Sequence, residues 1–294
     1  MIPIRARRWI AAAGVAIVLS AAVLIAAGAP SAGAVSKRSV VAAFYPVAYA
    51  AQRVGGNRVD VTNLTPAGAE PHDLELTPQQ IDEILDADLV FDLGQGFQPA
   101  VEKAAEQRDG PTVSLLPHGT RDPHIWLDPV RMKAIVRRVQ RSLTQADPKG
   151  RAVYARNADT FVAELDALND RYAQGLATCA RKVIVTGHEA FGYLARRYGL
   201  RQEGVAGLSP DAEPDAQRLG QLADLVKRQG VTTVFTEELV SPRIADTLAR
   251  EAGVKTDTLN PLEGLTDSDV ARGAGYVTVM DQNLHKLERA LGCS

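Results

Sequence analysis

Three of the five histidines in this sequence lie in segments that place an imidazole in a loop. His72 lies in EPHDLE, His124 in DPHIWLDP and His188 in TGHEAF, each beside proline or glycine. Neutral imidazole is a preferred ligand of Zn²⁺ and neighbouring transition metals, and an enclosed metal site needs three or four ligands. Each histidine alone is most simply a loop residue without a role. Taken together, the three predict a metal site.

The other histidines and the cysteines do not extend this set. His118 lies in a loop of proline and glycine outside these segments, and His285 lies on the last predicted helix, where we expect it at the surface. The sequence has no Cys-x-x-Cys pair, so thiolate ligands are not expected. Cys179 and Cys293 are predicted to form a disulfide, because export would place them in an oxidising compartment. Two free thiols are the alternative, since spacing alone fixes no geometry.

The elements that must position the histidines alternate between strand and helix. Residues 39–49 begin as a strand and pass into a helix, and further strands are predicted at residues 59–64, 89–93, 112–116, 182–186, 231–236 and 254–259. Helices are predicted from Thr77-Pro78 onward and at residues 217–228, 241–252 and 276–291. Residues 129–177 are almost entirely helical, and their second part, 150–177, is long and amphipathic.

This alternation predicts an α/β fold with two lobes of mostly parallel sheet, joined by a long spanning helix. Ligands of open α/β sheets bind outside the carboxyl ends of the strands. The metal site is therefore expected in the cleft between the lobes.

A fourth ligand is expected from the second lobe. The strand at residues 254–259 ends in NPLEG, which places Glu263 in a suitable loop. Asp257 lies inside that strand, and Asn260 is a weak ligand for a transition metal. Glu237 and Glu238 follow the strand at residues 231–236 and are the other candidates.

Three ordered motifs of the chain resemble those of the zinc and manganese solute-binding proteins of bacterial ABC importers, the family also called cluster A-I. Pro-His-x-x-Glu stands at residues 71–75, Asp-Pro-His-x-Trp-Leu-Asp-Pro at 122–129 and Gly-His-x-Ala-Phe at 187–191. The resemblance covers nearly the whole chain after residue 34. It implies two α/β lobes, a rigid spanning helix and one metal ion bound between the lobes. It also implies that His72, His124 and His188 are metal ligands and that Glu263 is the fourth.

Two features depart from the family pattern. Many zinc-binding members carry a histidine-rich loop before the second motif, whereas residues 116–121 of this chain hold only His118. The family often has glutamate after the glycine-rich turn that follows the strand at residues 89–93, and this chain has Gln98. We expect neither difference to remove a ligand.

The ligand set favours zinc as the transported ion. Three imidazoles and one carboxylate suit tetrahedral Zn²⁺, whereas Mn²⁺ prefers more oxygen ligands. Manganese-binding members of the family usually replace the third histidine with a carboxylate, so His188 favours zinc and manganese is the alternative.

Other classes of protein are compatible with parts of the pattern. A secreted zinc hydrolase needs a general base, for which Glu189 is the candidate, but no second histidine follows His188 at the spacing of a metalloprotease helix. We therefore expect no enzymatic activity. An extracellular metal-buffering adhesin would use the same site. Capture of a cobalamin or siderophore is disfavoured by the three histidines.

The beginning of the chain predicts export. Three arginines, Arg5, Arg7 and Arg8, precede an apolar run, and residues 32–34 suit a signal peptidase. We expect a signal peptide at 1–34, an N-terminal α/β lobe at 35–148, a linking helix at 149–178 and a C-terminal α/β lobe at 179–294. An uncleaved anchor is the alternative, since the apolar run is long enough to span a bilayer.

Charge and family resemblance together set the expected partners. A formal net charge of −2 gives no basic field for nucleic acid. The resemblance implies a metal ion as ligand and an ABC transporter permease in the cytoplasmic membrane as partner. We expect a monomer in the periplasm or at the cell surface.

Overall fold

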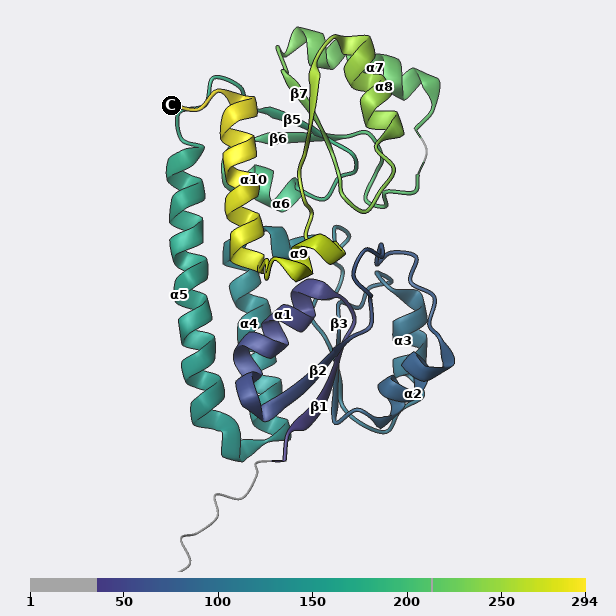
Figure 1. The fold of residues 1–294 in the computed structure, drawn as a ribbon, viewed down its shortest axis with the longest axis vertical. Coiled ribbons are helices and arrows are strands. Elements are labelled where there is room, and N and C mark those ends of the chain that lie inside the picture. Colours follow the sequence, from purple (N-terminus) through teal and green to yellow (C-terminus); the bar gives the residue numbers. More distant parts are fainter. Residues whose placement is uncertain (1–35, 213) are drawn as a thin grey trace, which may run out of the picture. The chain divides into compact units, whose positions relative to one another are not determined.

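The computed structural model describes residues 36–212 and 214–294, and Ser36–Ser294 form one compact unit. Two four-stranded sheets organise this unit, and every strand pair in both sheets is parallel (Figure 1). The α/β fold with parallel sheets is thus confirmed. The predicted signal peptide lies outside the described residues.

The first sheet has the strand order β2-β1-β3-β4. Its strands and helices are β1 (Arg38–Ala42), α1 (Tyr45–Gly55), β2 (Val59–Asn63), α2 (Pro78–Asp86), β3 (Leu89–Asp92), α3 (Pro99–Ala105) and β4 (Thr112–Ser114). The start of α2 agrees with the sequence, because the Thr77 hydroxyl accepts a hydrogen bond from the Gln80 backbone and the Gln80 side chain accepts one from the Thr77 backbone.

Two long helices follow the first sheet. They are α4 (Pro129–Ala146) and α5 (Arg151–Gly175), separated by a short 3₁₀ turn at Pro148–Gly150. Proline at residue 148 and glycine at residue 150 account for the break. The buried side chains of α5 recur every three or four residues and form one stripe, made of Tyr154, Ala158, Phe161, Leu165, Leu168 and Tyr172. This helix is the spanning helix predicted at residues 150–177.

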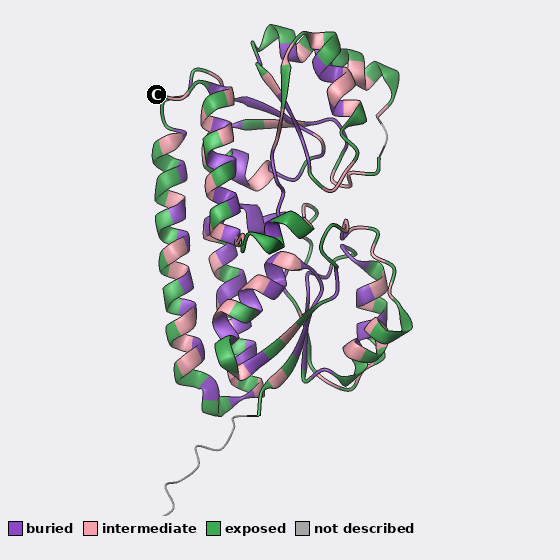
Figure 2. Ribbon diagram, viewed as in Figure 1, coloured by how far each residue is buried: buried purple, intermediate pink, exposed green. Residues whose placement is uncertain are grey.

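The second sheet repeats the order of the first, as β6-β5-β7-β8. Its elements are β5 (Val183–Thr186), α6 (Gly192–Arg197), β6 (Arg201–Gly204), α7 (Ala216–Arg228), β7 (Thr233–Thr236), α8 (Arg243–Ala252), β8 (Lys255–Thr258), α9 (Asp267–Ala271) and α10 (Tyr276–Leu291). The final helix, α10, runs beside α5 (Figure 1). In Figure 2 both helices alternate between buried and exposed residues along their length.

Four short elements escape the sequence pattern: α3, α6, β6 and α9. The strand β6 has the sequence RQEG, which has no apolar residue and no alternation. It is an edge strand that pairs only with β5, so its conformation depends on a neighbour distant in the sequence. The helices α3, α6 and α9 have five to seven residues, too few for a clear helical period.

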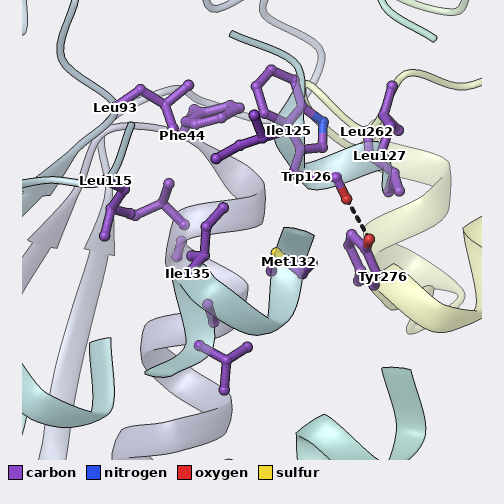
Figure 3. Packing of buried hydrophobic residues seen from close by; sticks show 14 of the residues in the cluster. Phe44, Leu93, Leu115, Ile125, Trp126, Leu127, Met132, Ile135, Leu262 and Tyr276 are labelled. Atoms are coloured by element: carbon purple, nitrogen blue, oxygen red, sulfur yellow. Dashed lines mark hydrogen bonds between the residues drawn. The ribbon is translucent and has the colours of Figure 1, made fainter. Parts of the chain in front are cut away.

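The larger hydrophobic cluster does not stop at the end of the first sheet. It runs from β1, β3 and α4 through α5 to residues of the second half such as Phe191, Leu262 and Tyr276. Figure 3 shows Leu262 and Tyr276 beside Trp126 and Leu127. The Tyr276 hydroxyl donates to the Trp126 carbonyl oxygen. A smaller cluster lies among β5, β7, α7 and α8.

The proposed lobe boundaries therefore remain a prediction, because α10 and the loop that holds Leu262 share a core with the first half.

The predicted disulfide is confirmed, since Cys179 and Cys293 are joined. The bond ties the segment before β5 to the segment after α10. Among the helices of the described ranges, none is both long and apolar enough to cross a bilayer.

Candidate metal centre

The residues predicted as ligands all come from loops at the carboxyl ends of parallel strands. His72 lies between β2 and α2, and His124 follows β4. His188 comes two residues after β5, and Glu263 follows β8. The first two loops belong to one sheet and the last two to the other, so the four side chains meet between the halves.

The ligand atoms of these four residues lie close enough to hold one ion. Glu263 Oε1 is 3.3 Å from His72 Nε2, 3.2 Å from His124 Nε2 and 3.2 Å from His188 Nε2. The Nε2 atoms of His124 and His188 are 3.3 Å apart. In a tetrahedral zinc site with metal–nitrogen distances of about 2.0–2.1 Å, neighbouring ligand atoms lie about 3.3–3.4 Å apart. These four of the six distances match a tetrahedral site, and all four ligand atoms lie within 4.8 Å of one another.

His72 is the outermost member of the set. Its side chain is 11% exposed, whereas those of His124, His188 and Glu263 are 1% exposed or less. The ring of His72 packs edge-on against Phe97, and its backbone N–H donates to Glu70 Oε2 at 2.9 Å. It lines a cavity of about 150 Å³ that Leu208 from the second half also borders. Of the four residues, His72 is the one that lines this cavity.

His124 is fixed by its own loop. Asp122 Oδ1 lies 3.1 Å from the His124 backbone nitrogen and 3.0 Å from Nδ1 of its ring. A 3₁₀ turn at Ile125–Leu127 follows, and Asp128 then caps α4 by accepting from the Val130 backbone at 2.9 Å. The DPHIWLDP motif thus builds a turn, a ligand and a helix start in eight residues.

His188 is held at both its backbone and its ring. Glu237 Oε1 accepts from the His188 backbone N–H at 2.8 Å, and Glu237 Oε2 lies 2.6 Å from Nδ1 of the ring. The His188 carbonyl oxygen accepts from the Thr186 hydroxyl at 2.6 Å and from Gln202 Nε2 at 2.9 Å. Its Nε2 therefore faces the centre.

The loop with Glu263 is braced from both halves. Leu262 has a φ of 58°, which is uncommon for a residue with a side chain, and its backbone N–H donates to Asn260 Oδ1 at 2.7 Å. Leu262 is fully buried, so its packing holds this conformation. Trp126 Nε1 donates to the Pro261 carbonyl oxygen at 2.8 Å. The carboxylate of Glu263 is thereby fixed in the centre.

The electrostatics of the centre follow from the contact of one carboxylate with three imidazoles. Burial alone would raise the pKa of Glu263, but hydrogen bonds with His124, His188 and His72 bring that pKa well below its ordinary value. Burial lowers the pKa of His188, yet Glu237 and Glu263 together raise it to about 10. Burial raises the pKa of Glu70, at the rim beside His72; His72 opposes this increase and Glu263 adds to it, and the result is about 7.

The other candidate ligands lie elsewhere. Asp257 is paired with Arg289, and Glu238 accepts from Asn260 Nδ2 at 2.5 Å. Neither belongs to the four-residue group, and Asn260 and Glu237 do not belong to it either. Glu237 instead holds His188, a role that the sequence pattern missed.

Three further polar residues clarify the remaining sequence expectations. His118 is exposed, and His285 is exposed and paired with Glu288 at 3.0 Å. Gln98 is buried and donates to the Ala43 carbonyl oxygen and the Thr65 hydroxyl, outside the centre. The role of Asp122 was also missed, although its position two residues before His124 suits a carboxylate that accepts from the local backbone.

Two α/β halves joined by a long helix, with three imidazoles and a carboxylate buried between them, define the class of metal-type solute-binding proteins. The chain belongs to the ZnuA family, described as zinc-uptake complex component A, periplasmic, whose model matches residues 40–290. The resemblance drawn from the three motifs is thus confirmed.

Curated relatives from two bacteria support this assignment. The chain is 37% identical over 278 residues to the zinc-binding lipoprotein AdcA of Streptococcus pneumoniae, covering 86% of this chain and 56% of that protein. It is 35% identical over 280 residues to the high-affinity zinc uptake system protein ZnuA of Bacillus subtilis, covering 87% of this chain and 88% of that protein. The chain thus spans about half the length of the AdcA relatives it matches.

Solved structures agree with the fold. The Zn(II)-bound ZnuA-like domain of Streptococcus pneumoniae AdcA matches with a TM-score of 0.75 and 38% identity, covering 87% of this chain and 99% of that domain. The laminin-binding protein Lmb of Streptococcus agalactiae, described as having adhesin and metal-transporting activity, matches with a TM-score of 0.79 and 31% identity. It covers 86% of this chain and 99% of that one.

Proposed function

We propose that this protein captures Zn²⁺ outside the cytoplasmic membrane and delivers it to an ABC-type importer, with His72, His124, His188 and Glu263 as ligands. The observation that carries the proposal is the group of four buried or half-buried residues in which one carboxylate oxygen lies 3.2–3.3 Å from three imidazole nitrogens. The names of the AdcA and ZnuA relatives support zinc as the ion.

The composition of the centre also supports zinc over manganese. Three nitrogen ligands and one oxygen ligand match the preference of Zn²⁺, whereas Mn²⁺ prefers more carboxylate and carbonyl oxygen. One carboxylate offsets half of the charge of a buried dication, which lowers the cost of burying the ion.

A carrier fits the centre better than a hydrolase does. A catalytic zinc keeps one position for water and needs a base beside it. Here four protein ligands account for a tetrahedral site, and Glu189, the candidate base, has an exposed side chain outside the four-residue group. We propose that the protein works as a monomeric, exported carrier whose lobes correspond to residues 35–148 and 179–294.

The test combines binding with growth. Metal-stripped protein titrated with Zn²⁺ and Mn²⁺ in separate runs should bind one equivalent of zinc, and bind it more tightly than manganese. A host strain that lacks its own zinc carrier should grow under zinc limitation with this chain and its cognate permease, but not with His188→Ala. Tighter binding of manganese, or two tight zinc equivalents, would refute the proposed site.

The growth assay also separates transport from adhesion, which the Lmb match raises as an alternative. An adhesin that only stores metal would bind zinc in the titration and leave growth unchanged. Growth that depends on both the permease and the four ligands is the result expected for a carrier.

A further inference from the structure

Glu237 makes two contacts with His188 but does not belong to the group of four ligand residues. One carboxylate oxygen accepts from the backbone N–H of His188 at 2.8 Å, and the other lies 2.6 Å from Nδ1 of the ring. Both side chains are 1% exposed or less, so water does not compete for these bonds. A carboxylate that grips the backbone and the ring together leaves the ring little freedom to turn.

We propose that Glu237 is a positioning residue that fixes the ring of His188, with the Nδ1 proton toward Glu237 and Nε2 toward zinc. The inference rests on the proposed zinc-carrier function and deepens it. A hydrogen bond from the outer ring nitrogen sets the tautomer and orientation of a metal-bound histidine and increases its basicity.

Gly187 leaves the space that the Glu237 carboxylate needs to reach the backbone N–H of His188. A Cβ atom at Gly187 would lie 2.6 Å from Glu237 Oε1, well inside van der Waals contact. Glycine before His188 therefore lets the carboxylate reach the backbone N–H. The carbonyl oxygen of His188 is held by Thr186 and Gln202, so the backbone is fixed at its N–H and at its carbonyl.

The same arrangement recurs at the other fully buried imidazole. Asp122 Oδ1 lies 3.1 Å from the backbone nitrogen of His124 and 3.0 Å from Nδ1 of its ring. At His72 the Glu70 carboxylate accepts from the backbone N–H, but no hydrogen bond to Nδ1 of His72 occurs within the described ranges. Two ligands are thus held through Nδ1 before zinc arrives, whereas the half-buried ring of His72 is held by Phe97 and by Glu263 at its Nε2.

The first test measures zinc affinity in variants that change the charge and the length of the Glu237 side chain separately. Glu237→Gln keeps the shape but can satisfy only one of the two N–H donors, because its amide nitrogen is itself a donor. Glu237→Asp keeps the charge but shortens the reach by one methylene group, and Glu237→Ala removes both. All three should weaken zinc binding, by about 10–100-fold for alanine. Glu189→Gln is the matched control, since it removes the same charge one residue from His188 and should bind zinc like the wild type.

A spectroscopic readout separates positioning from general loss of structure. Long-range ¹H–¹⁵N imidazole spectra of the zinc-loaded wild type should show His188 with its proton on Nδ1 and zinc on Nε2. Glu237→Ala should keep zinc on Nε2 but shift the signal of the His188 Nδ1 proton upfield and speed its exchange with water, because the hydrogen bond to Glu237 is lost, and should leave His124 unchanged. Gly187→Ala should give the same change with Glu237 intact, because the added Cβ displaces the carboxylate.

The outcomes are distinct from those of the proposed function. Failure of the wild type to bind zinc would refute the carrier function. Wild-type binding together with unchanged affinity and an unchanged Nδ1 proton signal of His188 in Glu237→Ala would refute only the positioning role. Wild-type affinity in Glu237→Asp would also overturn it, because charge alone would then suffice. If Glu237→Ala fails to fold, Glu237→Gln and Gly187→Ala decide by the same two measurements.

Discussion

Replacing Glu263 by alanine should weaken zinc binding by about one and a half to two orders of magnitude. Its Oε1 lies 3.2–3.3 Å from the Nε2 atoms of His72, His124 and His188, so it contacts all three imidazoles. The Glu263 side chain is also buried. Truncating one partner of a buried charged pair costs about 2–5 kcal/mol.

Only part of that cost appears in zinc affinity. Glu263 also stabilises the protonated ring of His188, whose pKa the carboxylates raise to about 10, so the variant loses stabilisation without zinc as well. Water can take the fourth position on the ion. A net loss near the lower end, about 2–3 kcal/mol, corresponds to a change of about 30–150-fold in Kd.

The assay is a competition titration of metal-stripped protein against a chromophoric zinc chelator of known affinity. Glu263→Gln should fall between the wild type and Glu263→Ala, and His188→Ala should lose more than either. Asp257→Ala is the matched control, because Asp257 lies in the neighbouring strand but outside the centre. Wild-type affinity in Glu263→Ala, with a loss in Asp257→Ala, would show that the fourth ligand is misassigned.

Further predictions follow from the same geometry. Zinc must displace the protons of His188 and His124, whose raised pKa values mean that the protein without zinc binds more protons. Zinc affinity should therefore rise by at least about tenfold per pH unit between pH 7 and 9 and fall below pH 7. Calorimetry in buffers of different ionisation enthalpy should count at least about one proton released, and none would contradict the reasoning. Zinc at about 100 times its Kd should add about 2.7 kcal/mol to the free energy of unfolding and raise Tm by about 5–10 °C. A chelator should reverse this increase, while the circular dichroism spectrum stays that of a folded protein. Breaking the Cys179–Cys293 bond, which closes a loop of sequence separation 114, should cost about 2–5 kcal/mol in chemical denaturation and leave zinc stoichiometry at one. Trp126→Phe leaves the buried Pro261 carbonyl oxygen without its donor, so we expect a loss of about 1–3 kcal/mol of stability and weaker zinc binding. Unchanged stability and unchanged zinc affinity would mean that this bond does not brace the Glu263 loop.

The sequence predicted the two-lobed α/β fold and the four residues that meet in the centre. Motif order and strand periodicity suffice for the fold and the three histidines, because loops at the carboxyl ends of parallel strands must lie at one edge of a sheet. The choice of Glu263 over Glu237 and Glu238 also needed the family resemblance. The strand β6 was missed since Arg201–Gly204 has no apolar pattern and depends on pairing with β5.

Side-chain direction is what the sequence could not supply. Glu237 follows β7, where a ligand could stand, and only the fold shows that its carboxylate faces the ring of His188 and not the centre. Whether Glu237 joins the ligand group depends on how the loop after β7 lies relative to the loop after β5. This relation between distant segments cannot be read from a local sequence pattern. The role of these four residues as zinc ligands stays a prediction until binding is measured.

The contact between Trp126 and the second half has a consequence for how this sequence can diverge. Trp126 donates to the loop of Glu263, accepts from Tyr276 on α10 and lies two residues from His124. A mutation at Trp126 would therefore disturb two ligand loops at once, and one at Tyr276 would disturb the turn that follows His124, although neither side chain belongs to the centre. In a descendant lineage, substitutions at these two positions would limit how freely the carrier could be retuned to another ion.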